Sequence, residues 1–130
     1  MTLIRIKTLF VLASVGLFSQ FAAAESEVDS AAMKQIAAVI VTLDHFPTDE
    51  DFVTLDEIMS NGEVSAEVQL MAETVANIEH SANEEGKEAM TIIAGDSNAS
   101  EQAKGLAGII ANVNHAASDS AKEQIAILFP

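Results

Sequence analysis

The sequence contains no cysteine, no tryptophan and no tyrosine among its 130 residues. Without cysteine the chain can form no disulfide, offers no Cys/His catalytic pair, and has no cysteine to which a lipid anchor could be attached. Hydrophobic residues nevertheless make up 49% of the chain. We therefore expect a folded protein that is held together by packing alone, in spite of its few aromatic residues.

Basic residues are also scarce: 6 Lys and Arg stand against 20 Asp and Glu, for a formal net charge of −14. Two of the basic residues, Arg5 and Lys7, lie near the N-terminus, so residues 25–130 carry 4 − 20 = −16 charges. Such a chain is repelled by phosphate backbones and by anionic lipid headgroups. The composition excludes nucleic acid as a probable partner class and favours a basic or otherwise cationic partner.

Residues 1–24 have the pattern of a cleaved secretory signal peptide. Arg5 and Lys7 provide the positive start, residues 8–18 (TLFVLASVGLF) are apolar, and Ala22-Ala23-Ala24 offers the small residues that signal peptidase accepts. The apolar stretch is shorter than the roughly 20 residues of a membrane-spanning helix. We predict cleavage after Ala24, no membrane insertion after that cleavage, and a soluble periplasmic or secreted protein.

Residues 25–130 are predicted to form a single domain of three tandem repeats, 30–64, 65–99 and 100–130. The repeats align at a spacing of 35 residues without insertion or deletion. Three columns are identical in all of them: Ser30/Ser65/Ser100, Ala37/Ala72/Ala107 and His45/His80/His115. Repetition at this period is typical of helical-repeat architectures.

Each repeat reads as two helices joined by a tight turn. The serine that begins each repeat is expected to cap the first helix, and apolar residues follow it at helical spacing. A second cap (Thr48, Asn83 or Ser118) comes shortly after the histidine and is followed by acidic residues, which helix N-termini favour. We predict an all-α fold of three 35-residue helical hairpins, six helices in total, forming either a short α-solenoid or a closed helical bundle.

The first helix of each repeat is expected to place five apolar side chains in the core. These positions are Met33, Ile36, Ala37, Ile40 and Leu43; Val68, Met71, Ala72, Val75 and Ile78; and Ala103, Leu106, Ala107, Ile110 and Val113. The second helices are expected to bury Leu55, Ile58 and Met59; Met90, Ile93 and Ala94; and Ile125, Leu128 and Phe129. The methionines are thereby assigned to core filling and not to copper binding.

The repeated histidines, His45, His80 and His115, are the candidate site residues. A histidine at a helix end can donate to a free carbonyl and interact well with the helix dipole, and this structural role is the preferred interpretation. The alternative is that they ligate zinc, copper or haem. In an open stack equivalent residues lie about 10 Å apart, too far to share an ion, so the alternative requires that the repeats close around an axis.

The remaining sequence motifs give weaker indications of function. Residues 96–100 (DSNAS) resemble the start of a calcium loop, but Glu101 replaces the required glycine and Ala107 the bidentate glutamate, which indicates a turn followed by a helix cap. The sequence has no nucleophile elbow, no HExxH motif and no phosphate-binding glycine loop. We therefore expect no catalytic residues and no enzyme activity.

Taken together, these features predict an exported acidic helical-repeat protein that acts as a binding or interaction module, with no bound cofactor. The first alternative is a metal- or haem-binding protein that uses the repeated histidines. The second is an acid- or stress-responsive periplasmic protein whose carboxylates protonate and loosen the fold. The partner is expected to be another protein or a cationic molecule, and a homo-oligomer is a further possibility.

Overall fold

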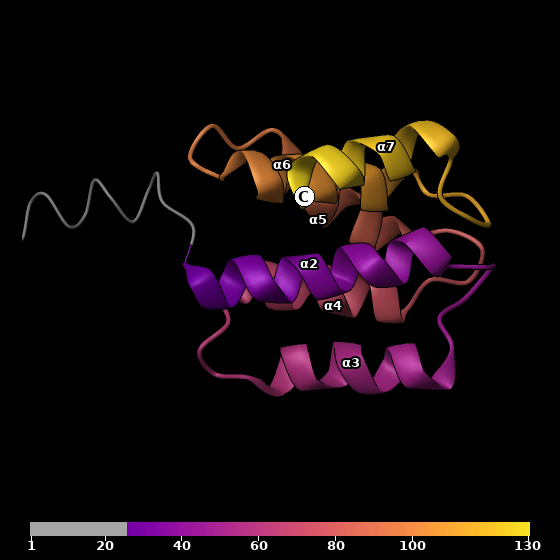
Figure 1. The fold of residues 1–130 in the computed structure, drawn as a ribbon, viewed down its shortest axis with the longest axis horizontal. Coiled ribbons are helices and arrows are strands. Elements are labelled where there is room, and N and C mark those ends of the chain that lie inside the picture. The colour runs from indigo at the N-terminus through magenta and orange to yellow at the C-terminus, as the bar shows by residue number, and fades with distance from the viewer. Residues whose placement is uncertain (1–25) are drawn as a thin grey trace, which may run out of the picture.

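The computed structural model describes residues 26–130, which form six helices joined by short turns. The helices are α2 (Glu27–Thr42), α3 (Asp49–Ser60), α4 (Ala66–Ala76), α5 (Glu84–Ala94), α6 (Glu101–Asn112) and α7 (Asp119–Leu128). The predicted all-helical fold is therefore confirmed, with α2–α3, α4–α5 and α6–α7 as the three hairpins (Figure 1). The predicted signal peptide lies outside the described residues.

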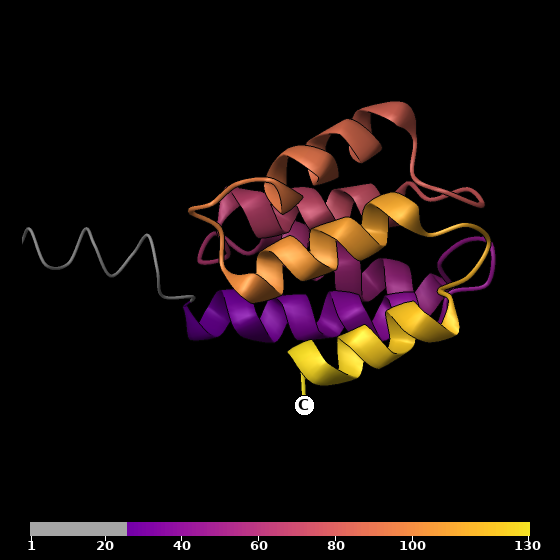
Figure 2. The ribbon, with the colours of Figure 1, turned by 90° about the horizontal axis from the view of Figure 1, so that it is seen from above.

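The three hairpins close into a bundle around a common axis. Helices α2, α4 and α6 all contact one another at the centre, and α3, α5 and α7 pack around them (Figures 1 and 2). The last hairpin lies against the first, since Lys34 Nζ in α2 donates to the main-chain oxygen of Pro130 at 3.4 Å. The alternative between an open stack and a closed bundle is thus decided in favour of closure.

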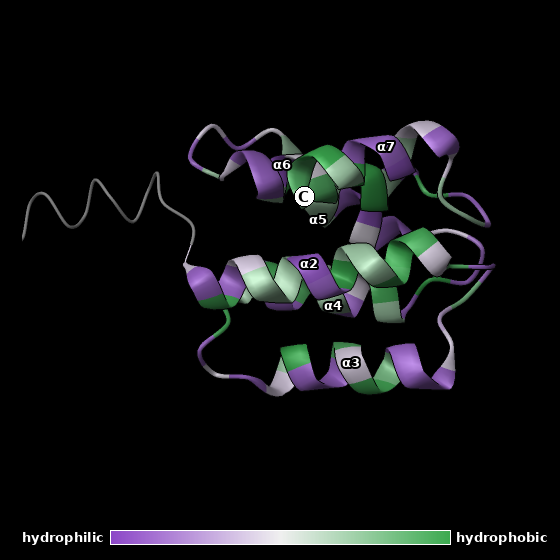
Figure 3. Ribbon diagram, viewed as in Figure 1, coloured by the Kyte–Doolittle hydropathy of each residue, from purple (hydrophilic) through white to green (hydrophobic). Residues whose placement is uncertain are grey.

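The core lies between the central helices, where the sequence placed it. All fifteen apolar positions predicted for the first helices are buried. In the outer helices Leu55, Ile58, Met90, Ile93 and Ile125 are buried, and Met59, Ala94 and Phe129 pack against the core from partly exposed positions. Leu128, which is predicted to be buried, is likewise partly exposed. Hydrophilic and hydrophobic residues accordingly alternate along the helices in Figure 3, with one side facing inward and one facing solvent. Across the described residues, no helix is both long and apolar enough to cross a bilayer.

Helix caps explain where the helices begin. Five predicted caps are confirmed, because each side chain accepts a hydrogen bond from a backbone N–H of the first helical turn: Thr48, Ser65, Asn83, Ser100 and Ser118. The predicted cap at Ser30 is wrong. Helix α2 begins one turn earlier with Ser26 as its cap, so the N–H of Ser30 already donates to the carbonyl oxygen of Ser26 at 2.9 Å. The Ser30 hydroxyl donates to Gln102 at 3.0 Å instead.

Candidate metal centre

The three histidines lie in the turns that join the two helices of each hairpin. Helices α2, α4 and α6 run in the same direction, so these turns come together at one end of the bundle, as both ribbon views show (Figures 1 and 2). The expected position in the last helical turn needs correction. The central helices end at Thr42, Ala76 and Asn112, and each histidine follows three or four residues later.

Each histidine occupies the tip of a tight turn with an unusual backbone conformation. The φ angles are 71° at His45, 74° at His80 and 68° at His115, and the structure has no other non-glycine residue with positive φ in its described part. The residues on either side of each histidine pair with one another as isolated bridges, so the chain reverses over a single residue. An L-residue with positive φ costs about 1–2 kcal/mol, and such strain tends to gather at functional sites.

A ring of main-chain hydrogen bonds joins the three turns. The N–H of His45 donates to the carbonyl oxygen of His115 at 2.5 Å, that of His80 to His45 at 2.6 Å, and that of His115 to His80 at 2.5 Å. Every histidine therefore donates once and accepts once within the ring. This arrangement holds the three backbones, and hence the three side chains, in fixed positions relative to one another.

The three imidazoles converge. Each pair of ring centroids is 5.0 Å apart, with interplanar angles of 82°, 87° and 78°. One nitrogen from each ring can be chosen so that all three lie within 4.8 Å of one another, and this is the only such group of histidine and acidic side chains found in residues 26–130. Residues that are separated by 35 positions in the sequence therefore form one cluster.

The spacing suits a single metal ion. Zinc–imidazole bonds are about 2.0–2.1 Å long and each ring centroid lies about 1.2 Å farther out, so three rings on one tetrahedral ion have centroids about 5 Å apart. The observed centroid distance is 5.0 Å. The ligating nitrogens on such an ion are about 3.3 Å apart, whereas those of the three rings lie within 4.8 Å of one another, so binding would require the rings to turn about their side-chain bonds.

The electrostatics of this end of the bundle favour a cation. Three helix C-termini and three helix N-termini meet at this end, so their opposite partial charges offset one another and the charged side chains decide the local potential. None of the central helices has a basic residue in its last turn. The outer helices begin at the same end with acidic residues: Asp49, Glu50, Asp51, Glu84, Glu85 and Asp119. Asp44 and Glu79, which directly precede two of the histidines, add further negative charge.

Asp44 also contacts the cluster directly. Its Oδ1 lies 2.6 Å from Nδ1 of His45, and since a carboxylate only accepts, Nδ1 is the donor in this contact and Nε2 is the nitrogen left to bind a metal. Carboxylate–histidine contacts of this kind orient imidazoles that bind metals. In the other repeats the residue before the histidine is Glu79 or Asn114. The three histidines therefore share the same backbone conformation but have different preceding side chains.

The site has an inner side and an outer side. Two residues before each histidine lie the apolar side chains of Leu43, Ile78 and Val113, which are all buried in the core. The imidazoles themselves are accessible: the His45 side chain is 45% exposed, and His80 and His115 are exposed. The cluster is therefore closed toward the protein by apolar residues and open toward solvent.

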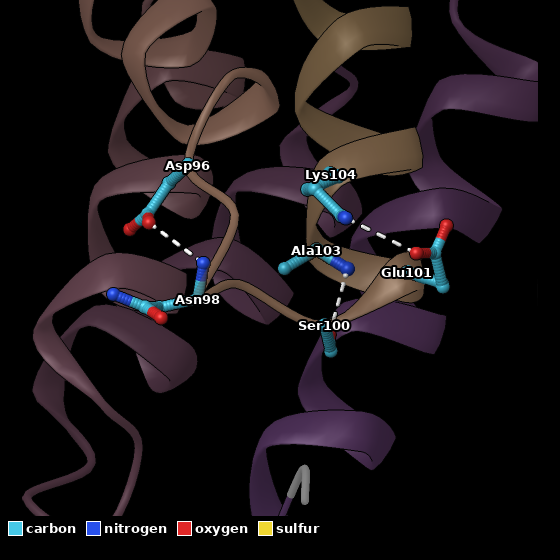
Figure 4. A network of polar contacts seen from close by, with 6 residues as sticks. All are labelled: Asp96, Asn98, Ser100, Glu101, Ala103 and Lys104. Atoms are coloured by element: carbon cyan, nitrogen blue, oxygen red, sulfur yellow. Dashed lines mark hydrogen bonds and ion pairs between the residues drawn. The ribbon is translucent and has the colours of Figure 1, made fainter. Parts of the chain in front are cut away.

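Residues 96–100, with their resemblance to the start of a calcium loop, form the expected turn and cap (Figure 4). The Asp96 carboxylate accepts from the backbone N–H of Asn98 at 2.9 Å, and the Ser100 hydroxyl accepts from that of Ala103 at 3.0 Å. Glu101, at the place of the required glycine, pairs with Lys104 at 3.1 Å. The Asp96 and Ser100 oxygens thus accept from the backbone, the Glu101 carboxylate pairs with a lysine, and the three do not gather around a common point.

A groove of about 470 Å³ runs between α6 and α7 beside the histidine turns. Its lining consists mainly of small and amide-bearing residues, among them Gly105, Gly108, Asn112 and Ser118, and includes none of the three histidines. The cluster thus lies at an open end of the bundle and not at the bottom of a substrate-sized pocket.

Comparison with known proteins gives no assignment: no family model, no curated protein and no solved structure matches this chain. The site must therefore be interpreted from its own geometry.

Proposed function

We propose that this protein binds one divalent transition-metal ion through the imidazoles of His45, His80 and His115. The observation that carries the proposal is the convergence of three imidazoles at the spacing that one tetrahedral ion needs. The ligands come from three separate hairpins, and a main-chain ring fixes their relative positions. The proposed role is that of an exported metal-binding protein without enzyme activity, and it is supported by the open position of the cluster, which lies outside the groove between α6 and α7.

Zinc is the ion that this arrangement favours. Imidazole nitrogens suit zinc, copper and nickel, but copper(II) and nickel(II) prefer planar or tetragonal ligand sets, whereas a three-fold tripod matches a tetrahedral ion. Haem fits poorly. An iron porphyrin takes its axial ligands on opposite faces of a wide ring, and the third imidazole, only 5.0 Å from each of the others, would occupy the space of that ring.

We continue to predict that the protein also acts as an interaction module, and its acidic surface indicates a basic protein as the partner. The negative charge of this surface is compatible with the proposed metal site, because an acidic end of the bundle raises the local concentration of metal ions and of basic proteins alike. The acid-responsive alternative also remains a prediction. A protonated imidazole cannot ligate, so loss of metal is an additional way in which acid would act on this protein.

Calorimetric titration of the untagged protein with zinc tests the proposal. We expect one ion per chain, and loss of this binding when all three histidines are replaced by asparagine, which tolerates positive φ without supplying an imidazole. Titration with magnesium controls for weak attraction to the carboxylates, since that ion prefers oxygen ligands. Equal zinc binding by the wild-type chain and the folded triple variant would refute the assignment.

A further inference from the structure

We infer that the metal keeps an open fourth coordination position on the outer side of the bundle, and that this position takes an imidazole from a histidine on a basic polypeptide. The inference rests on the proposed function and names the partner of the same site. It follows from the residues on the core side of the three imidazoles, from the residues next to them in the turns, and from the charges around their solvent-exposed side.

Residues 26–130 offer no fourth ligand from the core side of the cluster. The main-chain N–H and carbonyl groups of the three histidines are already paired with one another in the ring. Beyond the turns, the nearest side chains along the chain are the buried Leu43, Ile78 and Val113, which have no donor atom. An ion on the three imidazoles therefore cannot complete a tetrahedron from the core.

The protein also offers no fourth ligand from beside the cluster. Within residues 26–130, no acidic side chain joins the three histidines as a group able to share an ion. The nearest carboxylate, Asp44, is 2.6 Å from Nδ1 of His45 and is occupied in orienting that ring. The residues that follow the histidines, Phe46, Ser81 and Ala116, are poor zinc ligands. The fourth ligand would therefore come from solvent, as a water molecule that an incoming imidazole displaces.

The charge around the opening selects the kind of ligand. Asp44 and Glu79 precede their histidines, and the first turns of α3, α5 and α7 add Asp49, Glu84 and Asp119 at the same end. Carboxylates and phosphates approach this end against repulsion, whereas a neutral imidazole does not. A polypeptide that presents its histidine among lysines gains further attraction, and the exposed ring of Phe46 offers an apolar surface for it.

Cobalt(II) provides the test, because it replaces zinc and its visible absorption is far stronger in a tetrahedral site than in an octahedral one. The cobalt-loaded protein is titrated with imidazole and, separately, with acetate. We expect imidazole to shift the visible bands at a concentration at least tenfold lower than acetate. The cobalt-loaded protein is then titrated with two peptides that carry one histidine each, one rich in lysine and one rich in glutamate. At low salt the lysine-rich peptide should bind at least tenfold tighter than the glutamate-rich peptide. This difference in affinity should shrink at high salt, because salt screens the charges.

Replacement of single acids shows whether the charge at the opening is responsible. Glu79→Gln should reduce the preference for the lysine-rich peptide, whereas Glu63→Gln should not, because Glu63 lies in the α3–α4 turn at the opposite end of the bundle. Cobalt bands that no added ligand changes would overturn the open position while leaving metal binding intact. Preference for acetate, or for the glutamate-rich peptide, would overturn the choice of partner. Absence of cobalt binding would overturn both proposals.

Discussion

The strained histidine backbones predict an unusual order of stability among substitutions at His80. At this residue φ is 74°. Alanine there keeps a positive φ that costs an L-residue about 1–2 kcal/mol, whereas glycine avoids that cost and loses about 0.5–1 kcal/mol through its more flexible unfolded chain. Both substitutions remove the same imidazole. We therefore expect His80→Gly to be more stable than His80→Ala by about 0.5–1 kcal/mol.

Urea unfolding in the presence of a chelator measures this difference. The chain has no tryptophan or tyrosine, so far-ultraviolet circular dichroism is the suitable signal. Glu79 is the matched control, because it adjoins His80 and its φ is not positive. At Glu79 the order should reverse, with glycine less stable than alanine. If alanine were as stable as glycine at His80, the claim of backbone strain at these turns would be refuted.

Four further predictions follow from the site and the packing. Zinc at 100 times its dissociation constant should stabilise the fold by about 2.7 kcal/mol, seen as a higher melting temperature that a chelator reverses. Asp44→Asn should weaken zinc binding about tenfold in calorimetry, because the His45 ring loses its charged partner. Asp29→Ala should cost about 1–3 kcal/mol in urea unfolding, since this buried carboxylate accepts from the N–H of Ser65 at 2.8 Å. Gly108→Ala should instead stabilise α6 by up to about 1 kcal/mol in the same assay, because the added methyl meets no atom within 4 Å.

The helices and their buried faces could be predicted from local sequence alone. An apolar residue such as Ile40 or Ile110 is identified by its spacing from its neighbours, and a cap such as Thr48 by its place before an acidic turn. Ser30 misled the prediction because the repeat alignment suggested a helix start. In the first repeat the helix extends one turn upstream of that position, to its cap at Ser26.

Closure of the bundle could not be predicted in the same way. Whether three hairpins stack in a line or close around an axis depends on contacts such as that between α2 and α6, which no local pattern encodes. The convergence of the histidines is a consequence of that closure. The identical spacing of the histidines in the sequence is enough to suggest a shared site. The tight turns with positive φ cannot be predicted from that spacing.

The three residue positions that are identical in all repeats hold serine, alanine and histidine, and each can be compared with its structural role. The alanines, Ala37, Ala72 and Ala107, are fully buried where the central helices meet, so their small size has a packing reason. Two of the three serines cap helices. The histidine column is not explained by the backbone, because glycine suits a positive φ better than histidine does and the main-chain ring needs no particular side chain. The imidazoles do contact one another edge to face, with ring centroids 5.0 Å apart, which gives their side chains a packing role in addition to the proposed binding of metal. A residue that is placed three times where the backbone would favour another is explained by its side chain, and the convergence of three imidazoles is what supports the proposed metal site.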